Sequence, residues 1–340
     1  MKDLLSRVVA GDKLTEKEAF DTMDQIMNGK ATTGQMMSML SVMRYRGETV
    51  EEMTGFVRAM RSNMTKMDVD DPTIVDTCGT GGDGASTFNI STAVSIVLAS
   101  MRVKVAKHGN RKVSSRSGSA DVLETLGVPI DTTPEQGARA LAEKGMTFMF
   151  APLYHKAMKH AGPARQELGF RTIFNLLGPM SNPANAKRQL IGIYDTNFAE
   201  NMAETLKKLG STHVLLATGR DGLDEITVTG RTDVVELKDG QISRFTVSPK
   251  DFGLPLGNLE DIRITKTEES AQMIKDVLYG SANQSAASIV TLNAAAGLYV
   301  AGKADDLHEG VKLVQDAINN GVTREYFEAI ISERENRQYA

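Results

Sequence analysis

The chain has 340 residues, of which 41% are hydrophobic and 24% are charged, a composition typical of a soluble globular protein of about two domains. Its formal net charge of -4 speaks against nucleic acid as the main ligand, and its single cysteine, Cys78, excludes an internal disulfide. Because we find no signal peptide and no apolar stretch long enough to span a membrane, we expect a cytoplasmic protein without membrane or nucleic-acid partners.

The N-terminal segment 1–67 carries only helical patterns. Three sites in it have the sequence pattern of a helix N-cap: Thr15 with Glu18, Thr33, and Thr49 with Glu52. A methionine-rich apolar face follows each of these sites. Such faces are typical of core packing, and the alternative is a face that packs against a second subunit, since methionine suits adaptable apolar contacts.

After the acidic stretch 68–72 the pattern changes to short β-rich runs that alternate with capped helices. The predicted strands are Thr73–Asp76, Val103–Ala106, Thr147–Ala151, Leu190–Tyr194 and His213–Ala217. Strands alternating with helices indicate a largely parallel sheet covered on both faces. The turn Asp239-Gly240 lies between two further β-rich runs and predicts a hairpin, so the sheet is expected to be mixed. Further helices are expected near 267–279, 283–301, 305–319 and 323–334.

The expected fold class is therefore α/β, with two domains. A small all-helical domain is predicted over residues 1–70. A larger α/β domain, with a mixed, mostly parallel central sheet flanked by helices, is predicted over residues 71–340. The stretch of about 163–185 is punctuated by glycine and proline and breaks the alternation, and we predict that it packs back onto the helical domain. Segments that cross between domains often line the cleft.

The glycine-rich run Gly79–Gly84 lies between a predicted strand and a helix that opens at Asn89-Ile90-Ser91-Thr92. Glycine lets backbone N–H groups approach a ligand closely, and a helix N-terminus adds unpaired donors, so this run is a candidate phosphate loop. It has the spacing of neither a P-loop nor a dinucleotide-binding fingerprint. Asp83 inside the run favours a sugar phosphate with a metal over a bare phosphate. The alternative is a turn that binds nothing.

A basic run, Lys107–Lys112, follows the second predicted strand, and a serine-rich stretch leads from it to Ser119, which is expected to cap a helix. Loops at the carboxyl ends of parallel strands carry the ligands of α/β folds. Cations, hydroxyls and backbone donors suit a pyrophosphate, and the alternative is a solvated basic loop.

Two further motifs carry charges that suit a substrate or a metal. Asp224-Glu225 follows the fifth predicted strand, and its carboxylates, with the Ser91 hydroxyl, are oxygen donors of the kind that Mg²⁺ uses together with substrate phosphates. Arg165 lies near the start of a predicted helix, where its guanidinium could bind a substrate carboxylate. The alternatives are a polar surface turn for the acidic pair and a structural ion pair for Arg165.

In their order and spacing these motifs resemble those of the anthranilate phosphoribosyltransferases of tryptophan biosynthesis, over nearly the whole chain. The matching motifs are Gly79-Thr80-Gly81-Gly82-Asp83, Asn89-Ile90-Ser91-Thr92, Lys107-His108-Gly109-Asn110-Arg111, Asp224-Glu225 and the segment from Arg165 to Asn175. The resemblance implies a Mg²⁺-dependent pentosyltransferase that moves the phosphoribosyl group of 5-phosphoribosyl 1-pyrophosphate to the amine of anthranilate. It also implies homodimers formed through the helical domain.

The resemblance implies site residues as well. Those implied for the phosphoribosyl donor are Gly79, Gly82, Asp83, Thr87, Asn89, Ile90, Ser91, Thr92, Lys107, His108, Gly109, Asn110, Arg111, Lys112, Val113, Ser114, Ser115 and Ser119. Gly79, Asn110 and Arg165 are implied for anthranilate. Ser91, Asp224 and Glu225 are implied for magnesium, expected as a pair of ions. His108 and Lys107 are the candidates for a catalytic role. The alternative functions are a pyrimidine nucleoside phosphorylase and a non-catalytic regulator that binds a phosphoribosyl ligand.

Overall fold

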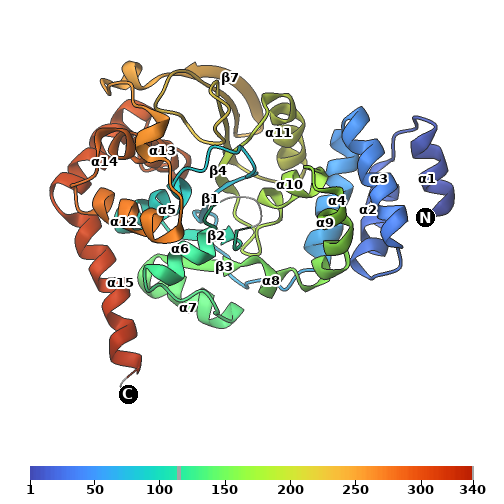
Figure 1. Ribbon diagram of the computed structural model, residues 1–340, viewed down its shortest axis with the longest axis horizontal. Coiled ribbons are helices and arrows are strands. Elements are labelled where there is room, and N and C mark those ends of the chain that lie inside the picture. The colour runs from blue at the N-terminus through green and yellow to red at the C-terminus, as the bar shows by residue number, and fades with distance from the viewer. Residues whose placement is uncertain (113–115, 339–340) are drawn as a thin grey trace.

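The computed structural model of the protein describes residues 1–112 and 116–338. A seven-stranded sheet lies at its centre, with the strands in the order β3-β2-β1-β4-β5-β6-β7. The strands are β1 Val75–Gly79, β2 Val105–Gly109, β3 Met146–Phe150, β4 Arg188–Gly192, β5 His213–Gly219, β6 Thr232–Lys238 and β7 Gln241–Val247. Strands β1 to β5 pair in parallel, and β6 pairs antiparallel with both of its neighbours, β5 and β7. The predicted mixed, mostly parallel sheet is therefore confirmed (Figure 1).

Helices flank the sheet, and the N-terminal helices form a separate layer at one end of the molecule (Figure 1). The N-terminal layer consists of α1 Lys2–Val9, α2 Glu16–Met27, α3 Thr33–Arg46 and α4 Val50–Ser62. The other helices are α5 Ile90–Ser100, α6 Ser119–Thr125, α7 Pro134–Lys144, α8 Ala151–Tyr154, α9 Gly162–Leu168, α10 Ile173–Leu177, α11 Ala199–Lys208, α12 Thr267–Leu278, α13 Gln284–Ala301, α14 Leu307–Asn319 and α15 Val322–Gln338. None of the helices described has the length and hydropathy needed to cross a lipid bilayer.

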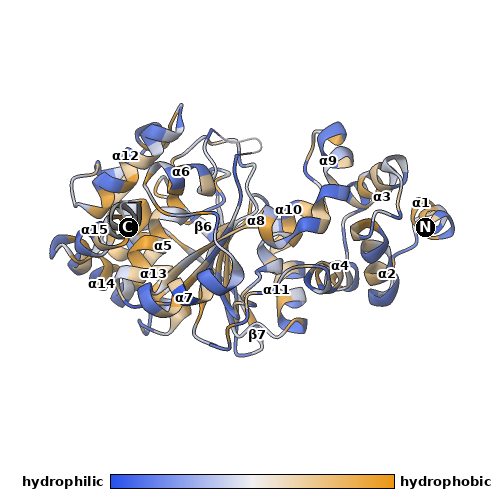
Figure 2. Ribbon diagram, turned by 90° about the horizontal axis from the view of Figure 1, so that it is seen from below, coloured by the Kyte–Doolittle hydropathy of each residue, from blue (hydrophilic) through white to orange (hydrophobic). Residues whose placement is uncertain are grey.

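The sheet is buried on both faces, as expected for parallel strands. Along β5, Leu215 and Ala217 join the apolar core formed with α5 and α13, which are strongly hydrophobic in Figure 2. Val214 and Leu216 join a second core, which also contains side chains of α11 and of the helical layer. The helical layer therefore shares a core with one face of the sheet. Helices α9 and α10 lie between the two parts and contact α3 and α4.

Of the four predicted helix caps, those at Thr15 and Thr49 are confirmed. Those at Thr33 and Ser119 are wrong by a single residue: Gly118 is the N-cap of α6, and Ser119 is the first residue of that helix. Capping boxes open α2 at Thr15 and α4 at Thr49. The cap of α3 is Thr32, not Thr33, because the Thr32 hydroxyl accepts the N–H of Gln35 while the Gln35 side chain accepts the N–H of Thr32. Gln35 completes a box only with Thr32, which places Thr33 inside the first turn.

The first two strands run further than their apolar sequence predicts. β1 continues to Gly79, which pairs with Gly192 of β4, and β2 continues to Gly109, which pairs with Phe150 of β3. Tertiary pairing overrides the local β propensity here. As a consequence, Lys107 and His108 lie within β2, and not in the loop that follows it.

Candidate active site

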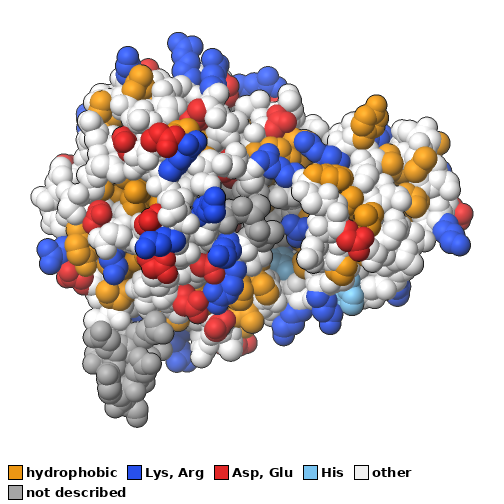
Figure 3. Space-filling model, in the orientation of Figure 1, with side chains coloured by type: hydrophobic (Ala, Val, Ile, Leu, Met, Phe, Trp, Pro, Cys, Tyr) orange, Lys and Arg blue, Asp and Glu red, His pale blue; other side chains and the backbone are white. Residues whose placement is uncertain are grey.

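A cavity of about 650 Å³ opens at the edge of the sheet where β1 and β2 end. Its lining comes from those strand ends, from the N-termini of α5 and α6, from the segment 151–159 after β3, and from α9 and α10. On the surface, Lys and Arg side chains surround the hollow between the helical layer and the α/β part (Figure 3). Because the carboxyl ends of parallel strands meet at one edge, motifs distant in sequence share this cavity.

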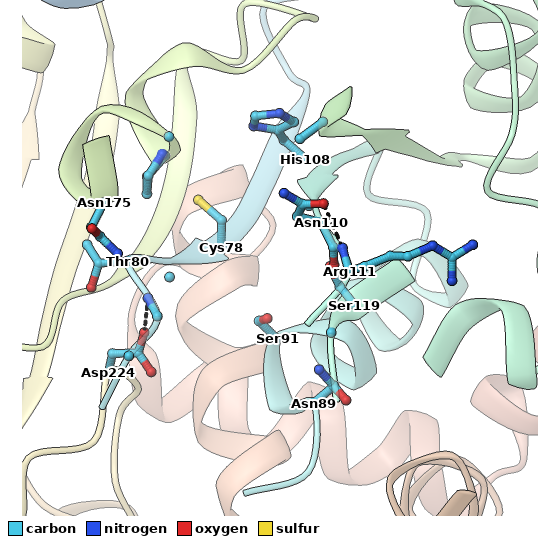
Figure 4. Close-up of a pocket in the computed structure, with 18 of the residues that line it drawn as sticks. Cys78, Thr80, Asn89, Ser91, His108, Asn110, Arg111, Ser119, Asn175 and Asp224 are labelled. Carbon is cyan, nitrogen blue, oxygen red and sulfur yellow. Dashed lines mark hydrogen bonds between the residues drawn. The ribbon is translucent and has the colours of Figure 1, made fainter. Parts of the chain in front are cut away.

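The glycine loop packs against the acidic turn at 224–225. Gly81 and Gly82 have φ values of 66° and 78°, in the left-handed region that glycine adopts without strain. The Gly81 N–H donates to Asp224 Oδ2 at 2.8 Å (Figure 4). On the other side, the Arg171 guanidinium lies against Gly82 and stacks on the Tyr194 ring, 4.2 Å from its centroid. The loop is therefore held from two directions.

The acidic turn holds more negative charge than its surroundings neutralise. Burial and the nearby Asp83 carboxylate raise the pKa of Asp224 to about 8. Burial and the adjacent Asp224 raise the pKa of Glu225 well above its usual range. No lysine or arginine forms an ion pair with either carboxylate among the residues that the structure describes. Clustered carboxylates with raised pKa values favour a bound cation.

The donor set suits a magnesium ion that is completed by substrate. No group of three or more acidic, histidine or cysteine side chains is arranged as metal ligands in the described ranges. Mg²⁺, however, is commonly held by only one or two carboxylates together with waters and substrate phosphates. The Ser91 hydroxyl, the third predicted ligand, accepts a hydrogen bond from Lys107 Nζ at 3.1 Å. Asp224 and Glu225 are thus better placed to hold a metal ion than Ser91, whose hydroxyl already contacts the Lys107 ammonium.

Lys107 lies at the floor of the cavity and is 2% exposed. Its ammonium donates to the Thr77 carbonyl at 2.6 Å and to Ser91 Oγ. Burial lowers the pKa of Lys107, and the buried Asp76 carboxylate opposes that effect. Since an ammonium has three donors, one N–H remains for a ligand in the cavity.

Arg111 turns away from the cavity, as Figure 4 shows. Its guanidinium donates to Asp121 Oδ1 and Glu124 Oε2, each at 2.9 Å. Asp121 Oδ2 also accepts the N–H of Lys112 at 2.8 Å and that of Gly118 at 3.1 Å, and so closes this loop on itself. The charge of Arg111 is therefore neutralised within the protein, and the part of Arg111 nearest a ligand is its backbone.

Helices α9 and α10 contribute Arg165, Phe174 and Asn175 to the lining of the cavity. The Arg165 guanidinium lies 5.4 Å from the centroid of the Phe174 ring. Burial lowers the pKa of Arg165, and no carboxylate in the described part of the chain forms an ion pair with it. A half-buried guanidinium beside an aromatic ring can bind the carboxylate of an aromatic acid.

Two histidines share the cavity wall. His108, at the end of β2, and His155, just after α8, have ring centroids 5.0 Å apart. Burial lowers the pKa of His108 to about 3 and that of His155 to about 4, so both rings are neutral near pH 7. Their Nε2 atoms are buried, and the backbone at Gly178 and Ser181 opposes the effect of burial on the pKa of His108 and of His155, respectively. The pair presents two neutral imidazoles to a ligand.

Most of the residues implied by the resemblance line the cavity. They are Gly79, Gly82, Asp83, Thr87, Asn89, Ile90, Ser91, Lys107, His108, Gly109, Asn110, Arg111, Ser119, Arg165, Asp224 and Glu225. Thr92 and Lys112 are absent from the lining: Thr92 is buried within α5, and Lys112 is exposed. Val113, Ser114 and Ser115 lie outside the described residues.

Several lining residues were not anticipated from the sequence, among them His155, Lys156, Lys159 and Phe174. The first three follow β3, whose carboxyl end lies at the same edge as those of β1 and β2. The rule that ligands bind at the carboxyl ends of parallel strands, which pointed to the loops after β1 and β2, therefore also applies to residues 151–159. No motif stood out there, because the histidines and lysines, in the 3₁₀ turn Lys156–His160 and just before it, have no recognisable spacing.

Two family models match the chain. The helical bundle domain of a glycosyl transferase family matches residues 2–64, and the a/b domain of that family matches residues 71–324. An anthranilate phosphoribosyltransferase of Geobacillus sp. (strain WCH70) is 56% identical over 329 residues, which are 97% of each chain. One of Bacillus licheniformis is 50% identical over 340 residues, which are 100% of each chain.

Solved structures share the fold. The crystal structure of anthranilate phosphoribosyltransferase from Thermus thermophilus has a TM-score of 0.91 at 37% identity, and the match covers 97% of this chain and 99% of that one. The enzyme from Saccharomyces cerevisiae in complex with PRPP and Mg has a TM-score of 0.88 at 24% identity, with 98% of this chain and 97% of that one covered. The yeast likeness is one of fold alone.

Proposed function

The chain belongs to the anthranilate phosphoribosyltransferase family, and on that premise we propose the reaction that it catalyses. It transfers the phosphoribosyl group of 5-phosphoribosyl 1-pyrophosphate to the amine of anthranilate and releases N-(5-phosphoribosyl)anthranilate and pyrophosphate. The observation that carries this proposal is the composition of one cavity. It joins a glycine loop and a helix N-terminus, an acidic turn short of positive charge, and an arginine without an ion-pair partner among the described residues.

The phosphoribosyl donor is proposed to bind between the glycine loop and the start of α5. The positive end of the α5 dipole stabilises phosphate charge at this position. The remaining N–H of Lys107 is available as a donor to the same ligand, whereas the Ser119 hydroxyl donates its proton to the Asn110 carbonyl and can only accept. The glycine loop, the start of α5 and Lys107 would bind the donor's two phosphate-bearing ends, and the Asp83 carboxylate would face the ribose hydroxyls.

Magnesium is proposed to be held by Asp224 and Glu225, and the use of two ions stays a prediction. When bound, Mg²⁺ supplies positive charge against the oxygens of the departing pyrophosphate. The two carboxylates would hold the ion in place. Their own positions are fixed by hydrogen bonds from the backbone N–H groups of Gly81, to Asp224, and of Ser91, to Glu225.

Anthranilate is proposed to bind through its carboxylate to Arg165, with its ring near Phe174. This contact directs the amine toward C1 of the ribose, and such positioning is a large source of rate. The amine is a weak base with a free lone pair, so it attacks C1 without prior loss of a proton. We propose inversion at C1 through an oxocarbenium-like transition state, with the amine attacking from the face opposite the departing pyrophosphate.

The histidine pair bears on the fate of the amine proton. After the new C–N bond forms, the nitrogen is cationic and must release a proton. Neutral His108, whose residue lines the cavity, is the candidate proton acceptor. Its low pKa makes it a weak base, however, so its contribution is expected to be small. Lys107, in this proposal, stabilises charge and takes no part in proton transfer.

The proposal is tested by mixing the protein with anthranilate, the phosphoribosyl donor and MgCl₂ and following the loss of anthranilate fluorescence. Loss that depends on all three components supports it. Phosphorolysis of uridine or thymidine in place of this reaction would identify a pyrimidine nucleoside phosphorylase. Tight calorimetric binding of the donor without turnover would identify a non-catalytic regulator.

The helical layer is also the proposed site of association between two copies of the chain. We propose that two copies associate through the helical layer, because Val9 on α1 and Tyr45 on α3 are 62% and 94% exposed although both are large and apolar. Sedimentation of the purified protein tests this association. The division at residue 70 and a cytoplasmic location stay predictions from the sequence.

A further inference from the structure

We propose that Ser270, on α12, is a positioning residue for the phosphoribosyl donor and that it acts through Asn89. The inference rests on the proposed function, in which Asn89 at the start of α5 contacts the donor. Ser270 has no exposed surface and is absent from the cavity lining, so it cannot touch the substrate itself. No sequence motif marks it, and 181 residues separate it from Asn89.

The Ser270 hydroxyl makes two hydrogen bonds with the same asparagine. It accepts the backbone N–H of Asn89 at 3.0 Å, and it donates to Asn89 Oδ1 at 2.8 Å. The other end of the amide, Asn89 Nδ2, donates to the Ser117 carbonyl at 3.2 Å. A chain of hydrogen bonds therefore runs from α12 through Asn89 to the loop that precedes α6.

These bonds determine which way the Asn89 amide faces. A hydroxyl has a single proton, and here its acceptor is Oδ1. If the amide were reversed, its oxygen would face the Ser117 carbonyl, and two acceptors would oppose each other. With Nδ2 toward Ser117, one of its two N–H groups is used and the second is available to an acceptor in the cavity, which is what a phosphate oxygen requires.

The same contact also locates the backbone. Asn89 immediately precedes α5, at whose start the phosphoribosyl donor is proposed to bind, and its own side chain does not cap that helix. The Ser270 hydroxyl instead binds the Asn89 N–H from a neighbouring helix. Ser270 thus orders both the amide and the first turn of α5 before the donor arrives, and such preorganisation lowers the entropy cost of binding.

The test is a double-mutant cycle between S270A and N89A, measured by steady-state kinetics with each substrate varied. We expect S270A to raise the KM of the phosphoribosyl donor about tenfold, the usual scale for one lost hydrogen-bonding partner, and to leave kcat and the anthranilate KM within about twofold. In the N89A background, S270A is expected to change the donor KM much less, because the bond to the side chain of residue 89 is already gone and only the bond to its backbone N–H is left to lose.

A matched control separates positioning from general loosening of α12. The Thr323 hydroxyl is also fully buried and donates to the Leu278 carbonyl at the opposite end of α12, at 2.6 Å. T323V removes that bond without contacting Asn89, so it should lower the melting temperature without raising the donor KM. If S270A does not fold, S270C, which keeps a weak donor and acceptor of similar size, should show a smaller increase in donor KM than N89A.

Three outcomes would overturn the inference: an unchanged donor KM in S270A or S270C, an equal increase in T323V, or an S270A effect that persists in full in N89A. These outcomes differ from those expected if the proposed function is wrong. In that case the wild-type protein would consume no anthranilate, or N89A alone would leave the donor KM unchanged.

Discussion

Replacing Gly192 with alanine is expected to abolish most of the activity by moving the acidic turn. Gly192 is the last residue of β4, and the backbone of Asp224 crosses directly above it. A Cβ atom at this position would overlap the Asp224 carbonyl oxygen and would lie 2.5 Å from its carbonyl carbon. Both atoms belong to the backbone, so the clash cannot be relieved by turning a side chain.

The size of the displacement sets the size of the effect. Ordinary contact for a Cβ atom is 3.4–4 Å, so the Asp224 backbone must move by at least about 1 Å from 2.5 Å. Displacements of that size at a reacting centre cost on the order of 100-fold in rate. We therefore expect G192A to lose at least about 100-fold in kcat/KM and to need more Mg²⁺. Overpacking should cost about 1–3 kcal/mol of unfolding free energy.

Two other glycines make the comparison specific. At Gly79 an added Cβ would lie 2.6 Å from Asp224 Oδ2, a side-chain atom that can rotate, so G79A should lose less activity than G192A. At Gly230 no atom lies within 4 Å of an added Cβ, so G230A should match the wild type. The assay is anthranilate consumption as a function of MgCl₂, with urea unfolding in parallel. A folded G192A that keeps its rate and its Mg²⁺ dependence within about threefold would refute the reasoning.

Three further predictions concern charge. R165A should raise the anthranilate KM by about 30-fold or more, because a charge-assisted hydrogen bond to the anthranilate carboxylate is lost, and should leave the donor KM within about twofold. An equal increase in both KM values in steady-state kinetics would count against the assignment. Because the pKa of Asp224 is raised to about 8 and its anion binds metal, Mg²⁺ affinity should rise between pH 6 and pH 8, and in D224N this pH dependence should weaken; calorimetric titrations at pH 6, 7 and 8 measure it. The pKa of His155 is lowered to about 4 in the folded protein. Below pH 6.5, therefore, His155 is protonated in the unfolded chain while it stays neutral in the folded protein. Its contribution to stability therefore falls by roughly 2 kcal/mol between pH 7 and pH 5, and H155Q should lose less stability than the wild type over that interval in urea titrations.

The sequence by itself determined the features that depend on short stretches of chain or on a topological rule. The capping boxes at Thr15 and Thr49 are complete within four residues, so they are recognisable without any tertiary contact. The alternation of strands and helices implies parallel pairing, and parallel pairing brings the loops after β1 and β2 to one edge. For that reason Gly79–Gly84, Lys107 and Asp224-Glu225 could be assigned to one site from their order alone.

Only the tertiary structure decided what each of those side chains faces. Lys107 and Arg111 belong to one basic run, yet the first is buried at the cavity floor and the second is paired with Asp121 and Glu124 outside it. His155, which follows α8, lies beside His108, and Ser270 of α12 forms a hydrogen bond with Asn89, although neither is near these partners in the sequence. The physical reason is that hydrogen bonds and burial depend on which segments the fold brings together. The sequence carries the glycine loop, and the packing around it decides which groups it meets.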